Sequence, residues 1–207
     1  MSRKNEKILK QAADILDILY IGETNSQDMI KGLTFSPDMK DEHFMHGNIN
    51  GFELSFITRA STFPEHNSSH IDQEWLLMRV ELPVSCIGHF YLNRHRYPRA
   101  FYRHIQLTIP QMKPLSLIAA STNVLFAHNY SVFGDTRNFV KPDDLFNDQL
   151  LQHLATAQIN LDYEIKDSFL YSTVPIFEFT AEDVQSMADM TIWMAGILES
   201  KLSYLQG

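Results

Sequence analysis

The pattern of hydrophobic and polar positions predicts helices at the two ends of the chain and strands in its middle. Near the N-terminus, apolar residues recur at steps of three and four: Ile8, Ala12, Ile15 and Leu19. This spacing is typical of an amphipathic helix. We expect that helix over residues 1–22, with Gly22 closing it. Residues 23–43 are rich in polar and turn-forming side chains and indicate a linker.

Short strands are expected between residues 44 and 134. The stretch 46–60 alternates apolar and polar side chains, which is the two-residue period of a strand. A second strand is expected over residues 74–83, ending at Pro83. Four more short apolar runs continue the pattern, at residues 89–95, 102–110, 115–120 and 124–134. The middle of the chain is therefore predicted to be a sheet.

The last third mixes helix and strand. Pro142, followed by Asp143 and Asp144, is typical of a helix start, and one apolar face follows: Phe146, Leu150, Leu151 and Leu154. Residues 159–177 indicate a hairpin that turns near residues 166–168. Thr180 and Asp183 form a capping-box variant at the start of a long final helix. Its predicted buried face is Val184, Met187, Thr191, Met194, Leu198 and Leu202.

These elements predict an α+β fold. We expect a central, mostly antiparallel sheet with an N-terminal helix, one internal helix and a long C-terminal helix. The expected organisation is a helix over residues 1–22, a linker over 23–43, an α+β core over 44–179 and a C-terminal helix over 180–207 packed on the core.

Charge is unevenly distributed along the chain. The net charge is −8, yet residues 82–134 carry five basic and no acidic side chains. Overall acidity argues against nonspecific nucleic-acid binding, so nucleic acid is not the expected partner. The basic stretch could still bind an anion, or it could pair with the acidic last third of the same chain.

An arginine-rich turn is the strongest candidate site. Arg94, Arg96, Arg99 and Arg103 surround Tyr97, and Pro98 favours a turn there. Guanidinium groups at a loop tip can form paired hydrogen bonds with phosphate or carboxylate. Three hypotheses stay open: anion or nucleic-acid binding, contact with a partner protein, and structural pairing with acids of this chain.

Signatures of catalysis and of cofactor binding are absent from the sequence. It has no Walker loop, no G-x-G-x-x-G, no G-x-S-x-G and no C-x-x-C, and the single Cys86 lies among apolar neighbours. His43 and His46, and His66 and His70, have ligand-like spacings, but the second pair lies in a polar loop. We therefore expect no catalytic residue, no cofactor and no metal.

The remaining expectations concern location and assembly. The apolar part of the N-terminal segment is broken by Lys10, Asp14 and Asp17, and no run approaches the roughly 20 apolar residues of a membrane span. We expect a cytoplasmic protein without a membrane span. The wide apolar surface around Met187, Met190 and Met194 predicts packing with the first helix, within one chain or in a homo-oligomer through the terminal helices.

The order of turn and apolar motifs resembles a known family. Gly47-x-Ile49-x-Gly51-Phe52 opens the strands, and Tyr130-x-Val132-Phe133-Gly134-Asp135 leads into a helix with an acidic start. This order resembles the bacterial family called domain of unknown function 3137, over residues 44–178. The resemblance implies no assigned activity and no catalytic residues. Many members of that family have membrane segments upstream, and this chain departs from that pattern.

The function we favour from the sequence is a noncatalytic binding or scaffolding module that acts through contacts with an unknown protein partner. Two alternatives stay open. One is a small-molecule or nucleotide-processing enzyme, and the other is an anion or nucleic-acid binder that uses the arginine turn at residues 94–103.

Overall fold

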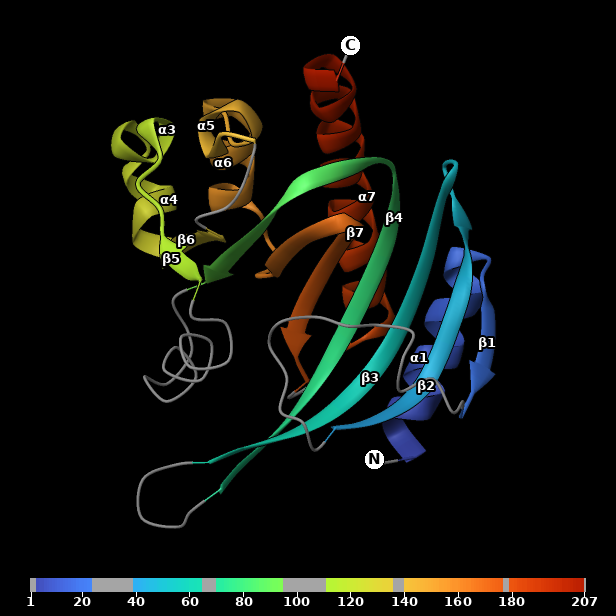
Figure 1. Ribbon diagram of the computed structural model, residues 1–207. Coiled ribbons are helices and arrows are strands. Elements are labelled where there is room, and N and C mark those ends of the chain that lie inside the picture. The colour runs from blue at the N-terminus through green and yellow to red at the C-terminus, as the bar shows by residue number, and fades with distance from the viewer. Residues whose placement is uncertain are drawn as a thin grey trace. The chain divides into compact units, whose positions relative to one another are not determined.

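A computed structural model describes residues 3–23, 39–64, 70–94, 111–135, 140–176 and 179–206. Within these ranges the chain forms six helices and seven strands (Figure 1). The strands pair mainly antiparallel, so the predicted α+β class is confirmed. The chain divides into two compact units. The first unit holds residues 1–81 and 171–193, and the second unit holds residues 82–170 and 194–207.

The first unit contains a sheet, the helix α1 and the first half of the final helix, α7. Its strands lie in the order β1-β2-β3-β4, and α1 lies against β1 and β2 (Figure 1). The largest buried side chains of this unit include Trp75, Phe56 and Met45. The elements that begin in this unit are α1 (Arg3–Leu16), β1 (Leu19–Gly22), β2 (Met39–Ile49), β3 (Phe52–Pro64), β4 (His70–Arg94) and α7 (Ala181–Gln206).

The first helix ends earlier than predicted, at Leu16, because the backbone of Asp17 turns left-handed (φ +53°). The N–H of Ile18 then donates to the carbonyl of Ala13 (3.0 Å), and that of Asp17 donates to Asp14 (3.4 Å). These two bonds form a Schellman motif, which satisfies the last helical carbonyls. Residues 19–22, which we expected to be helical, can therefore start the sheet as β1.

The single strand expected over residues 46–60 is wrong, because a two-residue turn splits it into β2 and β3. Asn50 and Gly51 both have positive φ (+53° and +88°), as a type I′ hairpin requires. Ile49 pairs with Phe52 on either side of the turn. The N–H of Gly51 also donates to the side chain of Asn48 (3.1 Å).

The expectation that Pro83 ends a strand is also wrong, since β4 continues through it to Arg94. The described pairs between β4 and β3 end at Val80, and those between β4 and β6 begin at Phe90. Pro83 has no N–H to donate, and it lies between the pairs described with β3 and those described with β6. The strand expected over residues 102–110 lies outside the described residues.

The second unit combines short helices with the rest of the sheet. Its strands lie in the order β4-β6-β5, and β7 also pairs with β4. Here α3 and α4 lie against α6 (Figure 1), and the ring of Phe90 meets the ring of Phe146 edge-on at 5.5 Å between centroids. The elements that begin in this unit are β5 (Met112–Pro114), α3 (Ile118–Thr122), α4 (Val124–Asn129), β6 (Tyr130–Asp135), α5 (Pro142–Leu145), α6 (Asp148–Thr156) and β7 (Asp162–Pro175).

Two predicted strands of this unit are helical. Residues 115–120 lead into α3, and the first half of 124–134 is α4, so that only its second half forms a strand, β6. The side chain of Asn123 accepts the N–H of Phe126 (2.9 Å), which caps α4. Short apolar runs occur in buried strands and in short helices alike, so their periodicity did not distinguish the two.

Two elements of the last third also differ from the prediction. The helix that begins at Pro142 stops at Leu145, and the side chain of Asn147 caps a second helix, α6, by accepting the N–H of Leu150 (3.1 Å). The predicted hairpin is instead one strand, β7. Asp167, at the expected turn, has a positive φ (+55°) and stays within that strand.

The final helix is confirmed. α7 (Ala181–Gln206) starts at the predicted capping box, in which the N–H of Asp183 donates to the hydroxyl of Thr180 (3.2 Å) and the N–H of Thr180 donates back to the carboxylate (2.8 Å). The six residues predicted on its apolar face are all buried. Among them, the hydroxyl of Thr191 lies 2.7 Å from that of Ser172.

Substitution of Gly47 by Ala tests the close approach between the end of α1 and β2. A Cβ at Gly47 would lie 2.4 Å from Cγ2 and 2.7 Å from Cβ of Ile18, so a rotamer change cannot relieve the clash. We expect Gly47→Ala to lower the free energy of unfolding by about 1–3 kcal/mol in urea denaturation.

Gly196→Ala is the matched control. A Cβ there meets nothing within 4 Å, and the position is inside α7, so we expect about 0.5–1 kcal/mol of added stability. Equal effects of the two substitutions would contradict this account.

Candidate functional site

Of the predicted arginine turn, the structure describes Arg94 alone; Arg96, Tyr97, Arg99 and Arg103 lie outside the described residues. Arg94 ends β4 and is half-buried. Its guanidinium carbon lies 5.5 Å from the centroid of the Tyr130 ring, which is cation–π geometry. Its backbone N–H donates to the carboxylate of Asp162 (2.7 Å). Arg94 therefore takes part in the packing of the second unit, and anion binding by the other arginines stays a prediction.

A group of buried polar side chains lies beside Arg94 in the second unit. Nε2 of His89 is 2.7 Å from the carboxylate of Glu164, and both side chains are largely buried. Four residues after His89 on β4, the side-chain amide of Asn93 donates to the hydroxyl of Tyr91 (3.1 Å). Because His89 and Glu164 are distant in sequence, their contact ties β4 to β7. Each of these two contacts pairs largely buried polar side chains, as is usual in a protein core, whereas Oδ1 of Asn93 is buried without a hydrogen-bond partner among the described residues.

Tyr163 lies on β7 between these polar residues and is fully buried. Burial raises the pKa of its hydroxyl well above the usual value, and the nearby Tyr130 and Asp162 raise it further. The phenol therefore stays protonated when the chain is folded. A hydroxyl in this state is not suited to act as a base.

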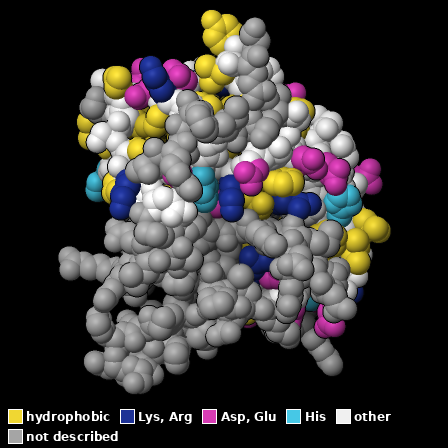
Figure 2. All heavy atoms as spheres, viewed as in Figure 1, with side chains coloured by type: hydrophobic (Ala, Val, Ile, Leu, Met, Phe, Trp, Pro, Cys, Tyr) yellow, Lys and Arg dark blue, Asp and Glu magenta, His cyan; other side chains and the backbone are white. Residues whose placement is uncertain are grey.

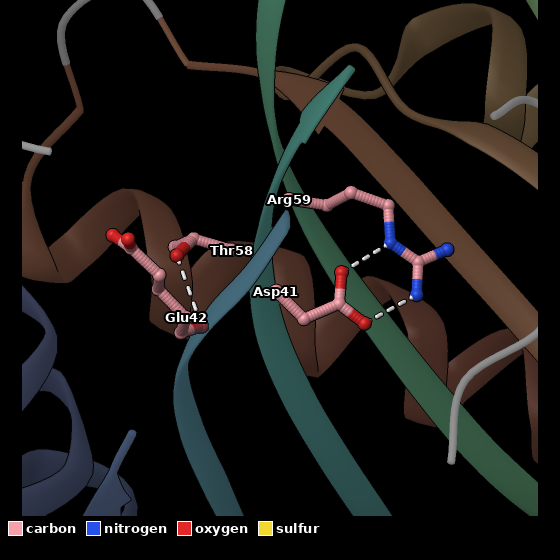
Figure 3. Close-up of polar contacts among 4 residues, drawn as sticks. All are labelled: Asp41, Glu42, Thr58 and Arg59. Atoms are coloured by element: carbon pink, nitrogen blue, oxygen red, sulfur yellow. Dashed lines mark hydrogen bonds and ion pairs between the residues drawn. The ribbon is translucent and has the colours of Figure 1, made fainter. Parts of the chain in front are cut away.

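A second buried polar contact lies in the first unit (Figure 3). Asp41 on β2 and Arg59 on β3 are cross-strand partners, and two guanidinium nitrogens of Arg59 donate to the two carboxylate oxygens at 2.5 and 2.7 Å. Their side chains are 3% and 1% exposed. The hydroxyl of Thr58 donates to the carbonyl of Glu42 (3.0 Å) in the next pair of the ladder. The geometry is that of an internal strand lock rather than of a ligand site.

The histidines with ligand-like spacing have separate neighbours. Nδ1 of His43 is 2.6 Å from the hydroxyl of Tyr20, whereas Nδ1 of His46 is 3.2 Å from the hydroxyl of Ser55. His66 lies outside the described residues, as does the side chain of His70. Over the described part of the chain, no group of three or more His, Cys, Asp or Glu side chains is placed to hold a metal ion.

The second unit exposes several large apolar side chains, which the sequence analysis did not single out. Ile118 is 74% exposed, Val124 78% and Tyr204 85%, and Leu125 and Leu205 are more than 40% exposed. Figure 2 shows hydrophobic side chains over α3 and α4 and again at the end of α7, with charged side chains between them. We call these five residues and the α5 residues between them the α3–α7 surface.

Contacts of α5 join the two apolar parts of this surface. The carboxylate of Asp143 accepts the backbone N–H of Ile118 (2.7 Å), and the backbone carbonyl of the next residue, Asp144, accepts a bond from Lys201 (3.2 Å). Lys201 lies one turn before Tyr204 on α7. The start of α3 and the end of α7 therefore lie on either side of the first turn of α5.

The strip between the apolar parts carries three aspartates and, beside them, the lysines Lys141 and Lys201. Asp143, Asp144 and Asp148 are all exposed, and Asp148 also accepts a bond from the hydroxyl of Thr122 (3.3 Å). Burial lowers the pKa of Lys201, while the charge of Asp144 acts in the opposite direction. Asp143 and Asp144 were recognised in the sequence as a helix start, but their position between exposed apolar residues depends on the fold.

Comparison with known proteins establishes a likeness of fold. No family model matches the chain, and no curated protein matches it. Among solved structures, it is similar to the crystal structure of the mycobacterial trehalose monomycolate transport factor A, TtfA, with a TM-score of 0.61 over 97% of this chain and 96% of that one. Sequence identity is 11%, so the similarity shows the fold alone. None of the described helices is long and apolar enough to cross a membrane.

Substitution of Asp41 tests the strand lock. Asp41→Ala leaves the buried guanidinium of Arg59 without its carboxylate, and we expect a loss of about 3–5 kcal/mol in the free energy of unfolding. Changing both residues, to Asp41→Leu with Arg59→Met, should restore most of this loss, because no buried charge then remains.

Glu6→Ala is the control for Asp41→Ala. Glu6 pairs with Lys10 at 2.7 Å on the exposed face of α1, and its removal should leave the urea midpoint unchanged. If the two alanine variants lost the same free energy of unfolding, the buried Asp41–Arg59 pair would stabilise the chain no more than an exposed ion pair does, contrary to this prediction.

Alkaline titration tests the burial of Tyr163. The pKa of its hydroxyl is raised in the folded state, so above about pH 10 the unfolded chain loses a proton that the folded chain keeps, and stability falls as pH rises. Tyr163→Phe should reduce that fall by up to about 1.4 kcal/mol per pH unit. Tyr204→Phe, at an 85% exposed position, is the matched control for the loss of a tyrosine hydroxyl.

Proposed function

We propose that the chain is a noncatalytic binding or scaffolding module that holds a partner protein on the α3–α7 surface. The observation that carries the proposal is the exposure of Ile118, Val124 and Tyr204, each more than 70% exposed, within one unit. Exposed large apolar side chains that gather on one part of a folded protein commonly mark a place where another molecule binds.

The contacts that hold this surface support a preformed site. The side chains of Asn123, Asp143 and Asn147 accept backbone N–H groups of α4, α3 and α6 respectively. The amide of Asn123 also donates to Gln152 on α6 (3.0 Å). A surface whose helices are fixed by such bonds loses less conformational entropy on binding than a mobile one does.

The polar groups described above favour a binding module over an enzyme. His89 with Glu164, and Asp41 with Arg59, are largely buried and bonded to each other. Such pairs hold strands together, and a candidate acid or base needs to reach a substrate. The arginine turn and a homo-oligomer through the terminal helices remain separate hypotheses.

A charged residue at an exposed apolar position of α4 tests the proposal. Val124→Glu should remove one or more proteins that wild-type chain captures from an extract of its native host. The free energy of unfolding of the variant should differ from that of wild type by less than about 0.5 kcal/mol, because Val124 is exposed. A captured protein should then be purified and titrated against wild type and variant by calorimetry, with at least about tenfold weaker binding expected for the variant.

Leu19→Glu is the matched control. Leu19 is a 64% exposed apolar residue of the first unit, outside the α3–α7 surface. Its variant should capture the same proteins as wild type. Identical capture by all three chains would overturn the proposal. A wild-type dimer in light scattering that Val124→Glu dissociates would also overturn it, because the surface would then be filled by a second copy.

A further inference from the structure

We infer that the α3–α7 surface binds a basic amphipathic helix of another protein. This inference rests on the proposed function and adds the chemistry of the partner. It follows from two properties of the surface: the elements that form it and the sign of its charge.

The surface is built from helices alone. Its apolar residues come from α3, α4 and α7, and its acidic residues from α5 and α6. A partner strand binds by adding to a sheet edge through main-chain hydrogen bonds, and these elements present no such edge. A helix needs only an apolar surface for side chains that recur every three or four residues. The elements therefore favour a helical partner.

The acidic strip determines the charge of that helix. Asp143, Asp144 and Asp148 lie between or beside the exposed apolar side chains. The last turn of α7 contains no basic residue, so the negative end of the helix dipole at Tyr204 and Leu205 is not compensated there. Lys141 and the half-buried Lys201 lie beside the same aspartates, but the three aspartates outnumber the two lysines, so the strip and the helix end together favour a negative potential where a partner would approach.

The same potential separates the classes of partner. Phosphates of nucleic acid and of anionic lipid headgroups are repelled by carboxylates, and both classes bind through basic protein surfaces. A helix with lysine or arginine next to its apolar stripe satisfies both parts of the surface. Its basic side chains can reach the aspartates while its apolar side chains contact Ile118 on one side of α5 and Tyr204 on the other.

Two synthetic peptides test the inference directly. Both are helical, about 18 residues long, with leucine every three or four positions; one carries lysine on its polar face and the other glutamate. In fluorescence anisotropy with the full chain, we expect the lysine peptide to bind at least about tenfold more tightly than the glutamate peptide. Its affinity should fall as the salt concentration is raised.

Asp144→Lys probes the charge without disturbing the caps. The Asp144 carboxylate makes no hydrogen bond to the described residues, whereas Asp143 and Asp148 bind Ile118 and Thr122. Asp144→Lys should lower the affinity of the chain for the lysine peptide by about threefold to tenfold. Asp189→Lys, at an exposed position of α7 in the first unit, should leave the affinity unchanged.

The outcomes separate the inference from the proposed function. Equal binding of the two peptides, tighter binding of the glutamate peptide or binding of neither would overturn the basic-helix inference, as would co-sedimentation of the chain with vesicles of anionic phospholipid. If a captured protein is lost with Val124→Glu but retained with Asp144→Lys, the proposed function stands and the inference fails. If Val124→Glu leaves the captured proteins unchanged, the proposed function itself fails.

Discussion

The hydrogen-bonding demand of one long strand constrains the rest of the sheet. β4 runs without interruption from His70 to Arg94 and contributes to both units. Buried backbone N–H and C=O groups need partners, so a strand of this length needs several neighbours. β3 pairs with it up to Val80, β6 pairs from Phe90, and β7 also pairs with it. Pro83, which has no N–H to donate, lies between the pairs described with β3 and those described with β6. Each unit thus includes part of β4 in its sheet.

The second unit completes its fold with short helices, and their length has a consequence for the surface. α3 and α4 have five and six residues, well below the roughly 12 at which an isolated helix persists in water. They depend on packing against α6 and on side-chain caps from Asn123 and Asp143. Such helices bury one side, as Phe126 does with 1% exposure, and leave the other side in water. The exposed Ile118 and Val124 lie on that second side.

The sequence predicted the long elements well and the short ones poorly, for identifiable reasons. α7 spans seven turns, so its period and its Thr180 cap agreed over many residues. The run 115–120 is too short for its period to distinguish strand from helix. The hairpin at Asn50 and Gly51 did have a recognisable signal, since this dipeptide favours a type I′ turn. Exposure could not be foreseen: Ile118 and Phe126 are both large and apolar, yet packing leaves one in water and buries the other.

The similarity to TtfA concerns the path of the backbone, whereas the proposed binding surface depends on side chains. At 11% identity two chains share the path of the backbone while most of their side chains differ, and function depends on side chains. A residue such as Val124 contributes little to the core, so folding of the chain alone does not explain why it is apolar. One exposed apolar residue would need no explanation. The five such residues described in the second unit, on both sides of the first turn of α5, are the observation on which the proposed binding surface rests.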